Sequence, residues 1–289
     1  MANTPVVVLD DTMTSIANAI RSKTGGSATM TPGQMPAQIA SIPSGTLGIP
    51  REVNANGVYG MPTVTGFSLP ANANDVGAYA FTYAFYGCSS LVSADLSSLT
   101  TVSGSYALED AFYKCISLTS VDLSSLTTVS GTYAFRYAFE YCSSLTSVDL
   151  SSLTTVSGGS AFQVTFSGCN SLVSVDLSSL TTVSGSYAFS SVFDNCSRLT
   201  SVDLSSLATM SGANAFNEAF RNCTSLTSLS FPALTTSSFG GSTTQFYRML
   251  SGVRGCTVHF PAAIQSTIGS WADVTNGFGG TNTTVLFDL

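Results

Sequence analysis

Cysteine recurs with a 27-residue period through the middle of the chain, and a thiol can form disulfides, bind metals or act as a nucleophile. The column consists of Cys88, Cys115, Cys142, Cys169, Cys196 and Cys223. Equivalent residues of stacked strands lie about 4.8 Å apart, a separation that a disulfide can span. No Cys-x-x-Cys pair or histidine column accompanies the cysteines, which disfavours a metal site. We therefore interpret them as small apolar side chains that fill one buried position per repeat.

A column of acidic residues follows the same interval and consists of Asp95, Asp122, Asp149, Asp176 and Asp203. Stacked carboxylates repel each other, and Ca²⁺, which prefers oxygen ligands, would relieve that repulsion. These residues are therefore weak candidate metal ligands. One acid per strand is fewer than a calcium loop gathers, so we favour carboxylates that accept hydrogen bonds from neighbouring serines and face water. We expect no metal and no other cofactor.

The sequence contains no recognisable catalytic signature. G-x-S-x-G, P-loop, H-E-x-x-H and dinucleotide-binding patterns are absent. The single histidine, His259, aligns with the acidic column and has no nucleophile motif beside it. A polysaccharide-degrading enzyme would require acids clustered in a groove, whereas these acids form one regular column. We expect a protein that is not an enzyme, and we expect Trp271 to be a packing anchor near the C-terminus.

The positions that differ between repeats carry more functional information than the constant ones. They lie beside a recurrent Ala-Phe pair, and in the first repeats they are rich in aromatic and charged residues. Tyrosine and arginine are enriched at binding hot spots, which suggests a binding ridge along the repeat array. The alternative is that these are exposed positions free to vary. The candidate ridge residues are Tyr83, Tyr86, Glu109, Asp110, Tyr113, Lys114, Arg136, Tyr137, Glu140 and Tyr141.

The elements that must position these residues follow from the period, because a constant 27-residue repeat indicates a stacked solenoid. Alternating apolar residues such as Val121 and Leu123 predict short strands. Ala134 and Phe135 recur four positions later as Ala138 and Phe139, a spacing that predicts a short helix in each coil.

The same register divides the chain into expected domains. Seven coils occupy 61–249, and a C-terminal β cap occupies 250–289, where Thr257–Pro261 repeats the pattern of Ser228–Pro232. Residues 1–45 show helical periodicity and predict a small helical attachment module. Residues 46–60 contain glycine, proline and asparagine and are expected to be a linker.

Composition restricts the partners and the location. The net charge of −7 disfavours a nucleic-acid binder, which needs clustered lysine and arginine. No run approaches the roughly 18 apolar residues that cross a bilayer. Only 9% of residues are charged, so serine, threonine and asparagine provide most of the polar surface. This balance suits an extracellular or virion surface.

The repeat unit resembles the BspA-like class of leucine-rich repeats, which occurs in bacterial surface proteins and some phage-associated proteins. The resemblance is carried by F-x-x-C-x-S-L-x-S-V-D-L and A-F-x-x-C over about 61–235. The 27-residue unit is longer than the usual form, and the additional residues correspond to stretches such as Ser130–Tyr133. The segments 11–26 and 35–42 resemble short modules at the start of tail-associated structural proteins of phages from gut Firmicutes.

These resemblances imply a leucine-rich-repeat-like solenoid with a non-enzymatic binding function. We expect a phage structural or adhesion protein on the virion surface, attached to a particle component through 1–45 and presenting the solenoid to a host surface. The alternative is a bacterial cell-surface adhesin that binds a glycan or a protein receptor. In both cases the modest contacts of single coils would add through multivalency, and an oligomer is compatible with either.

Overall fold

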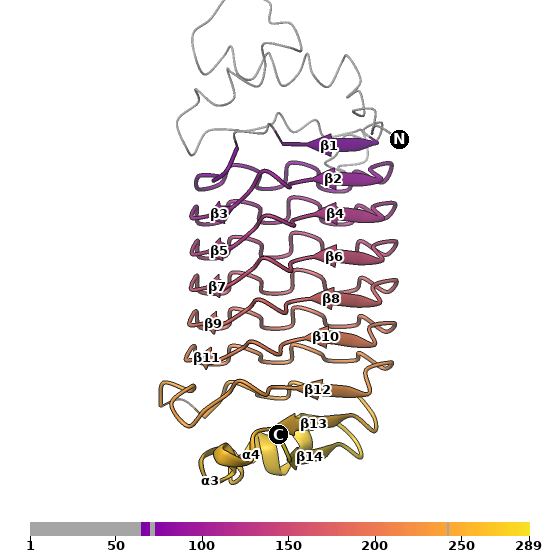
Figure 1. The fold of residues 1–289 in the computed structure, drawn as a ribbon. Helices are drawn as coiled ribbons and strands as arrows, with labels where there is room; N and C mark the ends of the chain where they lie inside the picture. Colours follow the sequence, from indigo (N-terminus) through magenta and orange to yellow (C-terminus); the bar gives the residue numbers. More distant parts are fainter. Residues whose placement is uncertain (1–64, 70–72, 242) are drawn as a thin grey trace, which may run out of the picture.

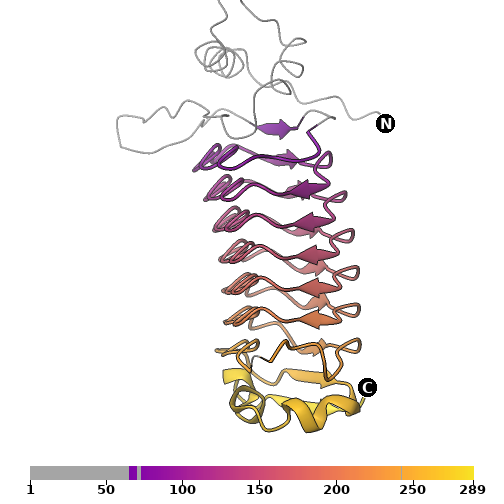
Figure 2. The same cartoon turned by 90° about the vertical axis from the view of Figure 1, so that its left-hand side faces the viewer.

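The computed structural model describes residues 65–69, 73–241 and 243–289, and these form a parallel β-solenoid of about eight turns. Figures 1 and 2 show the coils stacked one beneath another into a rod from β1 to β14. The predicted solenoid is thereby confirmed. The predicted helical module at 1–45 and linker at 46–60 lie outside the described residues, as does the start of the first expected coil.

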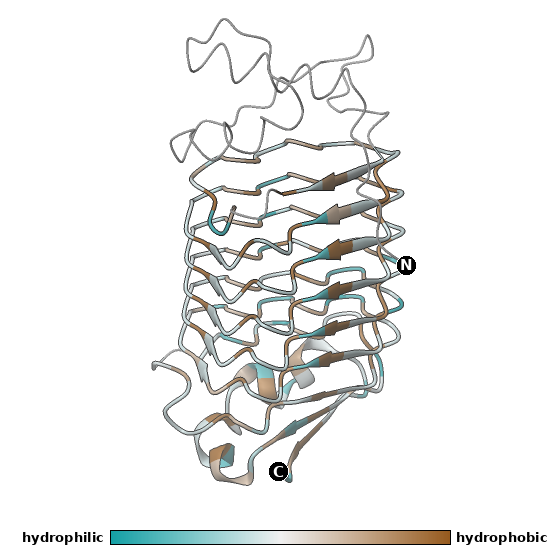
Figure 3. Ribbon diagram, turned by 45° about the horizontal axis from the view of Figure 1, so that its top comes forward, coloured by the Kyte–Doolittle hydropathy of each residue, from teal (hydrophilic) through white to brown (hydrophobic). Residues whose placement is uncertain are grey.

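The first sheet places one three-residue strand of each coil directly against the equivalent strand of the next. Every pair is parallel and joins equivalent residues of successive repeats, such as Val121 with Val148 and Asp122 with Asp149. In every strand of this sheet after the first, the central residue is buried and its neighbours are exposed or half-buried. Figure 3 shows the hydropathy changing along these strands. The sheet consists of β1 (Gly66–Ser68), β2 (Ser93–Asp95), β4 (Ser120–Asp122), β6 (Ser147–Asp149), β8 (Ser174–Asp176) and β10 (Ser201–Asp203).

A second parallel sheet forms another side of each coil. Its strands have two residues, of which the second is buried in every case. Thr128 pairs with Thr155 and Val129 with Val156, so the register of the repeat is preserved here too. The strands are β3 (Thr101–Val102), β5 (Thr128–Val129), β7 (Thr155–Val156), β9 (Thr182–Val183) and β11 (Thr209–Met210).

In the part of the solenoid that the structure describes, the third side of each coil contains no helix, so the predicted helix per coil is wrong. The chain instead makes consecutive turns, which we call the turn segments. These occupy 79–87, 106–114, 133–141, 160–168, 187–195 and 214–222. The predicted faces are nevertheless present, because Ala134, Phe135, Ala138 and Phe139 are all buried. Apolar residues spaced four positions apart are buried on one face both in a helix and in a row of turns. The periodicity of the sequence therefore could not distinguish the two conformations.

Hydrogen bonds between coils explain why turns replace the helix. The N–H of Phe135 donates to the carbonyl of Ala161 in the next coil, at 2.7 Å, whereas the N–H of Ala138 closes a turn onto Phe135. A helix would use these donors within one segment and would leave this side of neighbouring coils without backbone hydrogen bonds between them. A helix as short as one turn segment is also marginal by itself. The turns require positive φ at every fourth residue, for example 57° at Tyr133 and 58° at Tyr137.

The core consists of side-chain columns that run along the solenoid axis. Phe112, Phe139 and Phe166 are fully buried, and their rings stack with centroids 5.1 and 5.5 Å apart. A single coil cannot cover these rings, so each coil is stabilised by burying its apolar surface against its neighbours.

One glycine column allows the coils to approach closely. A Cβ atom on Gly131 would lie 2.1 Å from the carbonyl oxygen of Gly104, and one on Gly158 would lie 2.2 Å from that of Gly131. No side chain fits there, so glycine is required at this position for steric reasons rather than for its dihedral angles. The constant Ser-Gly of the repeat therefore sets the contact between successive backbones.

The stacking continues into the C-terminal segment. β12 (Ser228–Ser230), β13 (Thr257–Phe260) and β14 (Thr284–Phe287) form a three-stranded parallel sheet. Ser230 pairs with His259, which confirms the alignment of 228–232 with 257–261. The strands β13 and β14 provide the β structure that was expected in the C-terminal segment.

Short helical elements, which the repeat pattern did not predict, lie between β13 and β14. They are η2 (Ala262–Ile264), α3 (Gln265–Ile268), α4 (Ala272–Thr275) and η3 (Gly277–Gly279). Trp271 packs edge-on against Phe239 with ring centroids 4.9 Å apart, which agrees with its expected packing role. Within the described part of the chain, no helix has the length and apolar character needed to cross a membrane.

Candidate functional site

The candidate binding residues all lie in the turn segments, where their side chains alternate with the buried Ala-Phe pairs. Glu109 and Asp110 are buried, and the other eight are half-buried or exposed. We call the surface formed by the side chains of the turn segments that lie outside the core the turn face. Residues one repeat apart occupy equivalent positions on it, so the predicted ridge extends over three successive coils. These residues lie on turns and not on the helix that was expected to carry them.

Arg136 occupies the centre of an aromatic and ionic cluster. Its guanidinium bonds to the carboxylate of Glu109 in the preceding coil. The same group lies 4.2 Å from the ring centroid of Tyr133 and 5.3 Å from that of Tyr137. These contacts hold a planar cation among ring faces, an arrangement that is common at protein and glycan recognition sites.

A second aromatic cluster lies at the other end of the same turn segments. Tyr86 stacks on Tyr113 with centroids 4.6 Å apart, and Tyr113 meets Tyr141 edge-on at 5.8 Å. The Lys114 ammonium lies 5.1 Å from the Tyr113 centroid and 5.7 Å from that of Tyr141. Tyr141 is 45% exposed, so the cluster presents aromatic surface to solvent.

Two acidic residues between the clusters are poorly solvated. Burial, and then the charge of Glu109, raises the pKa of Asp110 to about 6. Burial, and then the charge of Asp110, raises the pKa of Glu140 to about 7. The charge of this part of the turn face therefore changes near neutral pH, which affects any partner that senses charge.

A tyrosine column that was not among the predicted site residues forms the edge of the turn face. Tyr79, Tyr106 and Tyr133 stack on one another with centroids 5.0 Å apart at each step. Tyr106 and Tyr133 stand in the S-G-x-Y stretch, which was interpreted as an insertion in the repeat framework, and Tyr79 occupies the equivalent position of the first coil. The periodic tyrosines themselves were the available signal, because rings at equivalent positions of successive coils must stack in a solenoid of this period.

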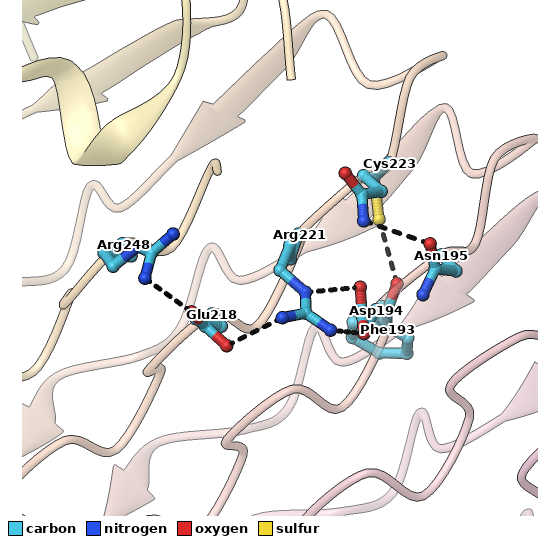
Figure 4. A network of polar contacts seen from close by, with 8 residues as sticks. Phe193, Asp194, Asn195, Glu218, Arg221, Cys223 and Arg248 are labelled. Atoms are coloured by element: carbon cyan, nitrogen blue, oxygen red, sulfur yellow. Dashed lines mark hydrogen bonds and ion pairs between the residues drawn. The ribbon is translucent and has the colours of Figure 1, made fainter. Parts of the chain in front are cut away.

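A charged network on the later coils was also not predicted as a site. The Arg221 guanidinium binds the carboxylate of Asp194 at 2.5 Å and that of Glu218 at 3.3 Å, and Arg248 binds Glu218 at 3.5 Å (Figure 4). The network links three coils through alternating charges. It replaces the aromatic clusters of the earlier coils and makes this half of the turn face polar.

The acidic column lies on the first sheet and faces solvent, as the favoured interpretation predicted. Each carboxylate accepts the backbone N–H of the serine two positions later, for example Ser151 onto Asp149 at 3.0 Å. Hydrogen bonds from the Ser151 hydroxyl and N–H lower the pKa of Asp149. Residues 65–69, 73–241 and 243–289 contain no group of three or more histidine, cysteine or acidic side chains suited to a metal ion.

The first sheet also carries a hollow of about 460 Å³ where β10 gives way to β12. Serine hydroxyls and two carboxylates of the acidic column provide its polar groups, and no aromatic residue lines it. The lining residues include Asp176, Asp203, Ser205 and Ser230. Its chemistry is that of a hydrated, hydroxyl-rich surface.

The cysteine column is buried and forms no disulfide among the described residues, which confirms a ladder of buried thiols. The thiol of Cys169 donates to the carbonyl oxygen of Phe139 at 3.2 Å, and the other central thiols repeat this contact. Burial raises the pKa of Cys169 well above its usual value, so the thiolate needed for nucleophilic chemistry is disfavoured. His259 contacts Asp288, with its Nδ1 2.9 Å from the carboxylate.

Comparison with known proteins identifies the class to which this solenoid belongs. The sequence matches the family described as BspA type leucine-rich repeat region, in six copies over 51–190 and 136–249. These ranges span more than half of the chain, and the protein therefore belongs to the BspA-type leucine-rich repeat family. Proteins with such repeats are typically non-enzymatic and located at the cell surface or outside the cell.

Solved structures of other leucine-rich repeat proteins resemble the chain only loosely. A protein from Eubacterium ventriosum is 26% identical with a TM-score of 0.39, the match covering 58% of this chain and 39% of that one. This chain thus spans well under half of that protein. Internalin C2 from Listeria monocytogenes is 13% identical with a TM-score of 0.29, the match covering 83% of this chain and 90% of that one. No curated protein matches the sequence.

Proposed function

We propose that this protein is a non-enzymatic surface-binding protein that presents the turn face of its solenoid to a glycan or protein on another surface. The carrying observation is the concentration of tyrosine, arginine and lysine on that face. Arg136 lies over the Tyr133 ring, and in the adjacent coil Lys114 lies over the Tyr113 ring. Elsewhere the outward positions of the constant repeat are mainly serine, threonine and aspartate.

The physical basis of the proposal is preorganisation. Arg136 is already bonded to Glu109, and the Tyr86 and Tyr113 rings are already stacked, so little side-chain entropy is lost when a partner binds. Exposed rings such as Tyr141 then offer apolar area beside fixed charges. Repetition along the rod adds contacts at high effective concentration.

A catalytic role is less well supported. Glycoside hydrolysis needs one carboxylic acid held protonated beside an ionised carboxylate. Serine hydrogen bonds lower the pKa of Asp149, so this carboxylate of the acidic column does not meet the requirement. Asp110 and Glu140 on the turn face do have raised pKa values, and the release of reducing sugar is the measurement that tests them. The usual non-enzymatic nature of the family points in the same direction.

Binding to bacterial cells tests the proposal. In the test variant, Arg136→Gln, Tyr137→Ser and Tyr141→Asn are combined, and each new residue already occupies the equivalent position of a later coil. The control variant combines Ser120→Ala, Ser147→Ala and Ser174→Ala on the first sheet. With both proteins fluorescently labelled, we expect the test variant to bind at least tenfold more weakly than the control. The test variant remains folded, with a small loss of thermal stability because the ion pair between Arg136 and Glu109 is broken. Equal binding by the two variants contradicts the turn-face assignment, and release of reducing sugar from the cells contradicts the non-enzymatic role.

The finer assignment to a phage particle is a separate proposal. It rests on the resemblance of 11–26 and 35–42 to modules of phage tail proteins, and these segments lie outside the described residues. If 1–45 is an attachment module, its deletion leaves a folded solenoid that no longer joins purified particles. A deleted protein that still assembles, or that fails to fold, contradicts the module. The alternative, a bacterial cell-surface adhesin, predicts recovery of the protein from cell envelopes instead.

A further inference from the structure

One ring is missing from the tyrosine column of the turn face. Tyr79, Tyr106 and Tyr133 stack at steps of 5.0 Å. The next residue in the column is Ser160, and the one after it is Tyr187. Because each coil rises by about 4.8 Å, the Tyr133 and Tyr187 rings are separated by roughly 10 Å, with only a hydroxymethyl group between them.

The backbone passes through this position without interruption. The N–H of Tyr133 donates to the Gly159 carbonyl at 2.9 Å, and the N–H of Ser160 donates to the Ser186 carbonyl at 2.8 Å. The φ angle of Ser160 is 51°, close to the 57° of Tyr133 and the 55° of Tyr187. The coil has therefore kept its spacing and its conformation, and the change is confined to the absent phenol ring.

The two residues at this place in the column, Gly159 and Ser160, are both small. Among the described residues Tyr187 stacks on no other ring, and it is 41% exposed. A Cβ atom on the adjacent Gly159 would meet nothing closer than 3.8 Å. Ser160 itself is nearly buried, with 9% of its surface exposed.

The chemistry of this space favours a sugar ring. A tyrosine lies one coil away on each side of it, and the negative face of a tyrosine ring attracts polarised C–H groups. The exposed residues Thr132 and Ser186 add hydroxyl groups to its rim, and Gln163 occupies the position equivalent to Arg136, which lies beside the Tyr133 ring. A pyranose presents C–H groups on its faces and hydroxyls around its edge, which matches aromatic walls and a hydrogen-bonding rim.

We propose that the gap at Ser160 is a binding slot for one neutral pyranose ring, held between Tyr133 and Tyr187. This inference rests on the proposed function, since it assigns a glycan as the molecule that the turn face binds. It goes further by assigning one subsite to two named rings. An aromatic side chain of a protein partner is the competing occupant, because its thickness also suits the gap.

Substitution of the missing residue tests the slot. Ser160→Tyr restores the ring that the column has in its neighbours, with a φ angle that tyrosine already adopts there, and so fills the slot from within. Ser160→Ala is the matched control that keeps the slot open. The probes are methyl β-glucoside, methyl β-galactoside and N-acetylglucosamine, together with N-acetyltyrosinamide, measured by saturation-transfer NMR on the full chain.

We expect at least one of the three sugars to receive saturation from the wild-type protein and from Ser160→Ala, and none from Ser160→Tyr. Absence of sugar binding to the wild type, sugar binding that persists in Ser160→Tyr, or binding of N-acetyltyrosinamide alone overturns the proposal. Binding to bacterial cells distinguishes failure of the sugar slot from failure of the proposed surface-binding function. If Ser160→Tyr leaves it unchanged while the triple variant at Arg136, Tyr137 and Tyr141 abolishes it, the slot is wrong and the proposed function stands.

Discussion

The thiol of Cys142 donates a hydrogen bond of 3.2 Å to the carbonyl oxygen of Phe112 in the preceding coil. The contact ties the start of one coil to the turn segment of the coil before it. Four other cysteines make the same contact, so the column contributes to the registration of the coils as well as filling space. A thiol suits this position because it is small and apolar and still provides a weak donor.

Thiol reactivity tests this arrangement. Burial raises the pKa of Cys142 well above its usual value, so we expect the native column to be inert toward Ellman's reagent at pH 8. All seven cysteines should react in guanidinium chloride, which counts the thiols and excludes disulfides. Rapid reaction of more than one thiol in the native protein would contradict the buried ladder.

The glycine column gives a prediction with a built-in control. We expect Gly131→Ala to destabilise the protein by about 3 kcal/mol or more, because the new Cβ overlaps backbone that cannot move without separating two coils. Gly159→Ala is expected to change stability by less than about 1 kcal/mol, since its nearest neighbours are 3.8 and 3.9 Å away. Urea denaturation measures both. Similar losses for the two variants would show that close backbone approach is not the cause.

The ion pair of the turn face should contribute measurably to stability. Glu109 is almost completely buried and its carboxylate bonds to Arg136 in the next coil. A double-mutant cycle with Glu109→Gln and Arg136→Gln is expected to give a coupling energy of about 1 kcal/mol. A coupling near zero would mean that the pair is held by packing alone.

Stability should decrease as pH rises through neutrality. Burial raises the pKa of Asp110 to about 6 and that of Glu140 to about 7, above their values of 3.8 and 4.5 in the absence of the fold. The folded state therefore binds more protons than the unfolded state between about pH 4 and 7, and the free energy of unfolding falls over that range. We expect a higher Tm at pH 5 than at pH 8.

A pair of variants assigns this dependence to the two residues. Combining Asp110→Asn with Glu140→Gln should flatten the Tm profile between pH 5 and 8. Asp149→Asn is the contrasting control, because the pKa of Asp149 is lowered and its contribution is lost only as pH falls below about 4. A profile that stays steep in the double variant would assign the effect to other groups.

The repeated sequence is sufficient to predict the stacked architecture, its register and the side of each coil that faces the core. All three follow from the repeat, because residues that recur at a constant interval lie beside one another in successive coils of a solenoid. Burial of the cysteines and exposure of Asp149 and its equivalents were predictable for the same reason. The later ion-pair network was not, since nothing in the spacing of Asp194 and Arg221 distinguishes a bonded pair from two exposed charges.

The choice between helix and turns for segments such as Tyr133–Tyr141 depends on contacts between assembled coils. Both conformations bury Ala134 and Phe135 together with Ala138 and Phe139, so local pattern could not discriminate. The difference lies in backbone groups, because alternate N–H donors such as that of Phe135 bond to the next coil and cannot serve a helix. The stacking of the tyrosine column and its interruption at Ser160 also depend on the tertiary structure, because the rings of successive repeats stack only when the coils are formed.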